Sequence, residues 1–414
     1  MTTKKILLHG QATGPTSLIQ LLMMLLLPTL LLSLLLLSST ADADAYIPKR
    51  DDTVLEELPA SWHSAEADSE HKWRQALTAN PTNINAATQL ARHYINNARQ
   101  HNDPRFYGYA EQVLSPWNDA PSVPPMVLLL RATIKQHFHQ FEQALNDLDH
   151  VLQIEPNNAQ AWLTRASISQ VTGHPLDAAK NCTILLKLTE PLVAVACLSR
   201  ALSTSGYTQE AYKQLHAAYN NARNPSIDTK VWALSILADI AYQLDNIDSA
   251  SQHYRDALAL SPGNTQVMLH FTDFLIEQQQ YNTAHQILHK KTNHNGLLLR
   301  LVITEGALNH PDLLLHRDLL NTRLTEEIRW NSYVSLRDQS RFHLAIQGNP
   351  GKALIFAQRN WQQQKELADL KLLLTAAIAA KKPETAISAI QWAQQHQIKD
   401  EKLNRLIALI QKTP

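Results

Sequence analysis

The sequence predicts an all-α protein, and three observations support this prediction. The 414 residues include only 10 glycines, and residues that favour helices, such as alanine, leucine and glutamine, are abundant. Small and apolar residues recur at helical spacing along most of the chain. Several helical segments end at a proline, which cannot continue a helix, and another segment begins directly afterwards. The chain is therefore predicted to be a series of short helices joined by turns.

The first 45 residues predict export. Leu18 to Leu37 is an uncharged apolar run that follows two lysines and precedes small residues with the spacing of a cleavage site. The run is also about long enough to cross a bilayer. Residues 1–45 are therefore expected to be either a signal peptide cleaved near Tyr46 or an N-terminal membrane anchor, and residues 46–63 an extended lead-in. The chain would then be periplasmic in a Gram-negative host, either soluble or anchored to the inner membrane.

Residues 64–294 are expected to form a regular array. A helix from about Ser64 to Leu77 comes first. Six helical hairpins are then predicted over Ala86 to Leu114, Pro125 to Ile154, Ala159 to Leu188, Pro191 to Ala222, Asp228 to Leu260 and Thr265 to His289. At the boundary before Ala159, Pro156 ends one helix and Asn158 can cap the next.

The recurrence of helix, turn, helix and proline at a period near 34 residues resembles the tetratricopeptide repeat (TPR). The best match starts at Leu234, and the residues that fall at the repeat's small, aromatic and proline positions are Leu237, Ala238, Ala250, Tyr254, Ala257 and Pro262. Trp162 opens another repeat, with Gly173 at its turn and Ala178 at a close-packing position. The resemblance implies a right-handed α-solenoid of about seven hairpins that binds a protein or peptide along its concave surface.

Residues 295–414 are expected to continue the solenoid less regularly. The pattern is helical but irregular after Asn295, and TPR-like spacing returns around Ala353 and Ala386. Lys402 to Ile410 is polar on one face and is predicted to be the capping helix that ends the stack.

Charge and motifs limit the function classes. The chain has 37 basic and 37 acidic residues, so no net charge favours nucleic acid. It has no nucleophile elbow, phosphate loop or metalloprotease motif. We therefore expect a non-enzymatic exported scaffold that uses no cofactor and binds a protein or peptide. The alternative is a membrane-tethered accessory subunit of an envelope or transport complex, which would contact the membrane through Leu18 to Leu37.

Histidines suggest a weaker alternative, a metal-binding helical protein. His285 and His289 are four residues apart and share a helical face, and His294 is nearby. The sequence offers no carboxylate at an obvious third position, so no metal site is predicted.

Cys182 and Cys197 are the only cysteines. They are predicted on adjacent helices, and export would permit a disulfide between them. Two buried thiols that pack as small apolar groups are the alternative.

Arginines suggest a binding groove. Arg131, Arg165 and Arg200 recur at spacings of 34 and 35 residues, which predicts equivalent sites on three successive first helices. Either they pair with helix ends and with acids such as Asp147, Asp149 and Asp177, or they face the concave groove and bind carboxylate or phosphate groups. The other predicted groove residues are Gln160, Ser167, Trp232, Asp239 and Tyr242.

A second candidate interface lies later in the chain. Arg337, Arg341 and Trp361 are of the residue types that anchor protein interfaces. Internal ion pairs and a core tryptophan are the alternative explanation.

Overall fold

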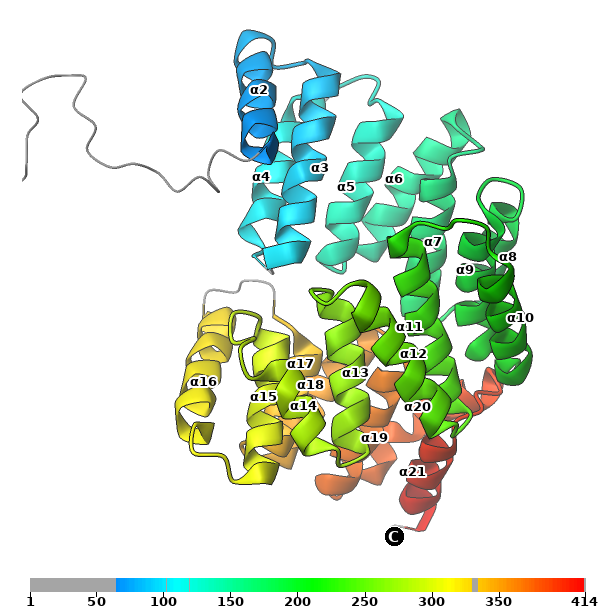
Figure 1. Cartoon of the computed structure of the whole chain (residues 1–414), viewed down its shortest axis with the longest axis vertical. Coiled ribbons are helices and arrows are strands. Elements are labelled where there is room, and N and C mark those ends of the chain that lie inside the picture. Colours follow the sequence, from blue (N-terminus) through cyan, green and yellow to red (C-terminus); the bar gives the residue numbers. More distant parts are fainter. Residues whose placement is uncertain (1–64, 102, 119, 330–333, 413–414) are drawn as a thin grey trace, which may run out of the picture. The chain divides into compact units, whose positions relative to one another are not determined.

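A computed structural model describes residues 65–412, except residues 102, 119 and 330–333 (Figure 1). The predictions for residues 1–45 and for the lead-in at 46–63 lie outside these residues. In the described part of the chain, no helix combines the length and the apolar character that a bilayer crossing needs.

The described residues form helices and turns, without a β-strand, so the predicted all-α class is confirmed. The helices of the first half are α2 (Ala65–Ala79), α3 (Ile84–His101), α4 (Arg105–Leu114), the short η2 (Ser115–Trp117), α5 (Pro125–His137), α6 (Phe141–Ile154), α7 (Ala159–Val171), α8 (Pro175–Leu185), α9 (Pro191–Ser203), α10 (Thr208–Asn221), α11 (Ile227–Gln243) and α12 (Ile247–Leu260).

The second half continues in the same manner. Its helices are α13 (Thr265–Glu277), α14 (Tyr281–Leu288), α15 (Asn295–Leu308), α16 (Leu313–Arg329), α17 (Leu336–Ala345), α18 (Pro350–Gln363), α19 (Leu367–Ala379), η3 (Pro383–Ala386), α20 (Ile387–Gln395) and α21 (Glu401–Lys412). The helix α21 corresponds to the predicted cap.

From α5 onward, each turn inside a hairpin of the described chain contains a residue with positive φ. Glycine adopts this conformation without strain, as at Gly173 and Gly206, where φ is 85°. Other turns use His139, Asp245 and Gln279 with φ near 58°. The left-handed residue reverses the chain so that the second helix returns along the first.

Side-chain caps start many of the helices. Asn158, Asn246 and Asn264 each precede a helix and accept a hydrogen bond from the backbone N–H three residues later. Each cap satisfies one of the otherwise unpaired N–H groups of the first turn. The asparagine predicted to cap the helix after Pro156 acts in this way.

Small residues set the distance between paired helices. Ala144, Ala178, Ala211, Ala250 and Ala284, one from each of five successive second helices, are at most 1% exposed. A short side chain at these points lets the antiparallel helices pack closely. This packing confirms the predicted TPR-like organisation.

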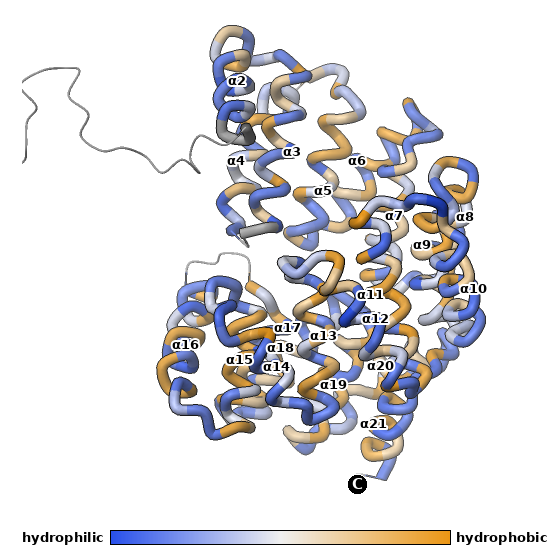
Figure 2. Tube along the Cα trace, in the orientation of Figure 1, coloured by the Kyte–Doolittle hydropathy of each residue, from blue (hydrophilic) through white to orange (hydrophobic). Residues whose placement is uncertain are grey.

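The core is continuous across the position where the sequence pattern weakens. One cluster of buried apolar residues extends from Leu192 to Phe342 and includes Leu297 and Leu301 of α15. Polar and apolar residues alternate along most helices, as expected for helices that bury one side (Figure 2). The packing of the array therefore does not stop at Asn295.

The C-terminal helices return to the first half of the chain. The backbone N–H of Lys365 donates to the carbonyl of Val171 at 2.7 Å. The indole Nε1 of Trp392 donates to the carbonyl of Gly173 at 3.2 Å. These contacts join the α18–α19 turn and α20 to the turn between α7 and α8.

Candidate functional site: the inner face of the helical array

The side of α7, α9, α11 and α13 that carries Ser167, Arg200, Asp239 and Asp273 is here called the inner face. Ser167, Arg200, Asp239 and Asp273 occupy the same register on it, because each lies six residues before the left-handed residue of its hairpin turn. The contacts of these residues show what the inner face binds.

Arg200 on α9 binds an acidic residue of the C-terminal half. Its Nη2 lies 3.0 Å from Oε1 of Glu366, at the start of α19. The other carboxylate oxygen of Glu366 accepts from Arg337 at 2.7 Å. Burial would raise the pKa of Glu366, but Arg337 and Arg200 outweigh this effect and lower the pKa to about 2.

Arg337 on α17 also binds the buried Asp369. Its Nε and Nη2 lie 2.5 and 2.7 Å from the two carboxylate oxygens, a bidentate arrangement. Asn360 donates a further hydrogen bond to Asp369 at 2.7 Å. The Asp369 side chain is fully buried, so these donors replace the water that it loses on folding.

Asp273 on α13 is the acidic counterpart of Arg200. It accepts hydrogen bonds from Arg341 of α17 at 2.7 and 2.8 Å and from Arg300 of α15 at 2.7 Å. Burial would raise the pKa of Asp273, but Arg300 and Arg341 hold it well below its usual range. On the inner face, Arg200 of α9 thus binds a carboxylate, and Asp273 of α13 binds guanidinium groups.

Asp239 lies between these two positions, on α11. It accepts from the hydroxyl of Tyr254 and lies 3.2 Å from Nδ1 of His270. Burial would raise the pKa of Asp239, but His270 outweighs it and lowers the pKa. In turn, the charge of Asp239 raises the pKa of His270 despite burial.

Tyr242, one turn beyond Asp239, also contacts the C-terminal half. The Nζ of Lys371 lies 5.4 Å from the centre of its ring. The Tyr242 hydroxyl donates to Glu277 of α13, and Lys402 of α21 pairs with Glu277 at 2.5 Å. The inner face of α9, α11 and α13 is therefore covered, at these residues, by α17, α19 and α21.

The prediction that the three repeating arginines occupy equivalent sites is wrong for Arg200. Arg131 and Arg165 each precede the left-handed residue of their turn by eight positions, whereas Arg200 precedes Gly206 by six. Two residues correspond to about 200° around a helix, so Arg200 points to a different side. Arg165 and Arg200 are 35 residues apart, whereas the left-handed residues Gly173 and Gly206 are 33 apart, and this difference of two residues cannot be seen from the arginine spacing alone.

The partners of the first two arginines lie in the preceding repeat. Arg131 donates to Asn118 at 2.6 Å, and Arg165 pairs with Asp149 of α6. The Arg165 pairing is the internal alternative considered from the sequence, whereas Arg200 binds a carboxylate on the inner face.

The remaining predicted groove residues differ in exposure. Gln160 and Ser167 of α7 are exposed, and Trp232 of α11 is half-buried against the core. A cleft of about 500 Å³ lies further toward the N-terminus, and its lining includes Arg131, Lys135 and Glu111. Of the predicted groove residues, the two exposed ones thus lie on α7.

Cys182 and Cys197 form a disulfide between α8 and α9, with their Cα atoms 5.6 Å apart. It closes a loop with a sequence separation of 15 residues. The bridge joins the exposed repeats to those whose inner face is covered.

The residues of the second candidate interface are engaged within the chain. Arg337 and Arg341 form the ion pairs described above, and Trp361 is 8% exposed. The Trp361 ring packs edge-on against Trp392, with centroids 5.3 Å apart. This arrangement corresponds to the internal alternative.

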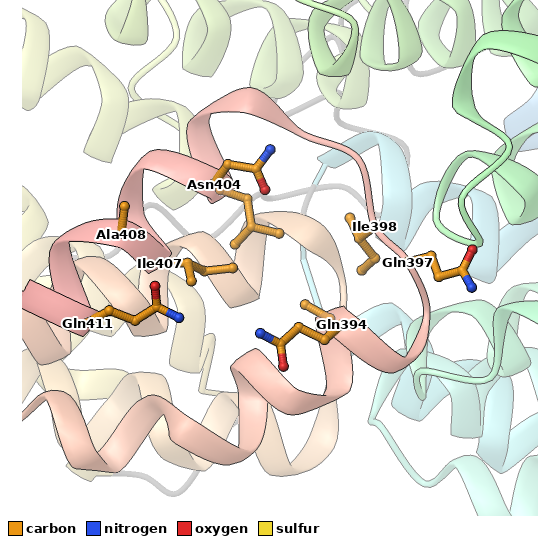
Figure 3. Close-up of a pocket in the computed structure, with 9 residues that line it drawn as sticks. Gln394, Gln397, Ile398, Asn404, Ile407, Ala408 and Gln411 are labelled. Carbon is orange, nitrogen blue, oxygen red and sulfur yellow. The ribbon is translucent and has the colours of Figure 1, made fainter.

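A smaller cleft lies at the C-terminal end of the array. It has a volume of about 210 Å³ and lies between α20 and α21, where Ile398, Leu403 and Ile407 meet Gln394 and Gln411 (Figure 3). Its apolar lining belongs to the packing of the terminal helix.

Sequence reasoning missed Asp273, Glu366 and Asp369. Counting the same number of residues back from the left-handed residue of each turn would have placed Asp273 at the same repeat position as Asp239. No local signal marks Glu366 and Asp369, because their partners Arg200 and Arg337 lie 166 and 32 residues away.

No protein-family model and no curated protein matches the sequence. Among solved structures, the chain is similar to the Cut9–Hcn1 hetero-tetramer of APC/C, with 15% identity over 83% of this chain and 68% of that chain, and a TM-score of 0.46. It is also similar to a Rap protein complexed with competence and sporulation factor, with 12% identity, coverage of 84% and 98%, and a TM-score of 0.48. The human IFIT1 dimer with m7Gppp-AAAA gives 12% identity, coverage of 80% and 86%, and a TM-score of 0.42.

Proposed function

We propose that this protein is an exported, non-enzymatic scaffold that binds a partner protein or peptide through its first repeats. The proposal rests on one observation: some inner-face residues have partners inside the chain and others are exposed. Arg200, Asp239 and Asp273 have partners inside the chain, whereas Gln160 and Ser167 are exposed. A partner therefore finds exposed polar groups on α7, on the N-terminal side of α9.

The cleft beside α5 suggests the chemistry of the partner. Arg131 supplies a cationic donor and Glu111 an acceptor, whereas Lys135 already pairs with Asp147 at 2.6 Å. Among the described residues, Arg131 donates to one neutral side chain, Asn118. A guanidinium so placed can form a bidentate pair with a carboxylate. We expect a polypeptide with an acidic side chain at this point.

The test compares two arginines at the same repeat position. The full chain, its Arg131→Ala variant and its Arg165→Ala variant are used to capture partners from the native envelope, and a captured partner is then purified and titrated. Loss of Arg131 should weaken its binding at least about ten-fold, as expected for an interface arginine. Arg165→Ala should leave affinity nearly unchanged, because Arg165 already pairs with Asp149.

Lys213→Ala, on the exposed side of α10, serves as a second control. Equal affinity of all three variants would contradict binding at the α5 cleft. A loss of affinity in Arg165→Ala alone would instead assign binding to the arginine that the structure pairs internally.

A membrane-tethered accessory subunit is the second candidate, and the apolar run from Leu18 to Leu37 favours it. Intact-mass measurement of the protein from its native envelope separates the two. A chain that begins near Tyr46 has lost the tether, and a chain that retains the run among membrane proteins supports the accessory role.

A further inference from the structure

We propose that His285, Glu305 and His310 form a binding site for a transition-metal ion, with Zn²⁺ as the best match. Within the part of the chain that the structure describes, this is the one group of three such side chains whose ligand atoms all lie within 4.8 Å of one another. The proposal is independent of the partner-binding function.

Three consecutive segments bring the ligands together. His285 lies on α14, Glu305 on α15, and His310 in the turn before α16. Asn309 has a φ of 51° and ends α15, which directs the following residue back toward Glu305. The site is thus built on one helix-turn-helix and its neighbour.

The distances suit a metal ion between the side chains. Glu305 Oε1 lies 3.8 Å from His285 Nε2 and 3.8 Å from His310 Nδ1. Ligands of tetrahedral zinc at about 2.0 to 2.1 Å are about 3.3 Å apart. Completing the site would therefore require the ligand atoms, which all lie within 4.8 Å of one another, to move closer together.

The carboxylate of Glu305 is buried and surrounded by imidazoles. Its side chain is 1% exposed, and His316 Nδ1 of α16 lies 2.8 Å from Oε1. Within the described part of the chain, its ion-pair partners are histidines, and no lysine or arginine pairs with it. A buried carboxylate needs a compensating positive charge, which a divalent cation supplies. His316 is placed to orient Glu305 through this hydrogen bond.

The imidazole of His285 is suited to ligation. Its Nε2 and the Nδ1 of His310 each lie 3.8 Å from Oε1 of Glu305, so both rings present a nitrogen to the same carboxylate oxygen. The His285 and His310 rings lie 4.5 Å apart. Two imidazoles and one carboxylate are a common zinc ligand set.

Another histidine pair provides a matched control. His216 and His253 lie 6.1 Å apart and contact Tyr212, but no carboxylate completes a three-ligand group with them. His289, which the sequence pattern pairs with His285, is exposed and its ring lies 6.0 Å from that of His285. In the structure, the residues grouped with His285 are thus Glu305 and His310, not His289.

The experiment titrates Zn²⁺ alone into the untagged full chain, purified in detergent and treated with chelator. Isothermal calorimetry gives the affinity, and native mass spectrometry gives the number of ions bound. One ion should bind tightly, and Glu305→Gln and His310→Gln should each weaken this binding at least about ten-fold. His216→Ala and His289→Ala should bind as the wild type does.

Circular dichroism without metal checks that each variant is folded, and Glu305→Gln preserves the size of the buried side chain. Absence of high-affinity binding by the wild type would overturn the proposal. So would unchanged binding by folded Glu305→Gln and His310→Gln, and loss of binding in His289→Ala alone would assign the ion to a different pair of histidines.

Discussion

The first repeats and the middle repeats of this array have the same helix pairing but use their inner surfaces differently. On α7, Gln160 and Ser167 are exposed. On α9 and α13, the residues in register with Ser167 are Arg200 and Asp273, and both bind charged residues of the C-terminal half. The comparison teaches that a solenoid can use part of its inner surface to hold its own chain and leave the rest free.

The difference arises from charge at one repeat position. Serine needs no charged partner, whereas a guanidinium or carboxylate that loses water must find one. The C-terminal helices supply oppositely charged groups, Glu366 for Arg200 and Arg341 for Asp273. The following predictions test this contrast.

The largest effect is expected for Arg337→Ala. The substitution leaves the buried Asp369 without its bidentate partner, which should cost about 3 to 5 kcal/mol of unfolding free energy. Denaturant unfolding followed by circular dichroism measures the loss. Arg405→Ala, which breaks an exposed pair with Glu401, should cost less than about 0.5 kcal/mol. Similar losses in the two variants would show that the network does not hold the C-terminal half.

Removal of the disulfide should have the next largest effect. The Cys182→Ser, Cys197→Ser double variant frees a loop of about 15 residues and should lose about 3 kcal/mol in the chain-entropy treatment. The bridge joins the repeats whose inner face is exposed to those whose inner face is covered. The loss of stability should therefore appear in both groups of repeats. Hydrogen exchange measured helix by helix would show this, and a loss confined to α8 and α9 would contradict it.

Low pH should break the contacts between the inner face and the C-terminal helices before it unfolds the rest of the chain. The pKa of Glu366 is lowered from 4.5 to about 2 in the folded chain, so its ionised form stabilises the fold above about pH 4.5. This stabilisation is lost as the pH falls toward 2. The side chain is 26% exposed, so we expect about 2 kcal/mol.

The measurement compares wild type with Glu366→Gln in denaturant at pH 5.5 and pH 2.5. The variant should lack this part of the pH dependence. Parallel pH profiles of the two proteins would show that Glu366 does not contribute to the acid sensitivity.

The smallest effect is expected for a glycine at the contact between the two halves. A Cβ on Gly173 would lie 2.7 and 3.0 Å from Cδ and Cβ of Lys365. Gly348 also has positive φ, but a Cβ there would meet nothing within 4 Å. Gly173→Ala should therefore cost about 1 kcal/mol more than Gly348→Ala, whose cost is backbone strain of about 1 kcal/mol.

Thermal unfolding of the two glycine variants gives the comparison. Equal losses would mean that the return of Lys365 to the α7–α8 turn adds nothing to stability beyond the strain that both turns share.

Much of the helix order follows from local chemistry. Proline, asparagine caps and small residues act within one or two turns of chain, so the hairpins from α3 to α14 lie close to their predicted positions. Beyond Asn295 the repeat spacing is irregular, but the core still continues through Leu297 and Leu301. Apolar residues that do not follow the repeat pattern can still form a buried core.

The site could be predicted only in part. Asp239 and Tyr242 follow from the repeat register, whereas the nearly even spacing of Arg131, Arg165 and Arg200 concealed that the hairpin turns are spaced differently at α9. Glu305 was missed as a partner of His285 because the two lie on different helices. Local periodicity shows which residues share a helix face, but it does not show which helix lies opposite.

The sequence by itself determined the helices, their pairing and the buried small residues, because these depend on neighbours within one repeat. Only the tertiary structure decided that α17, α19 and α21 cover Arg200, Asp273 and Tyr242. The energy of these contacts depends on charges that are far apart in the chain and meet only after the array has folded. Spacing along the sequence does not show which of these distant charges come into contact.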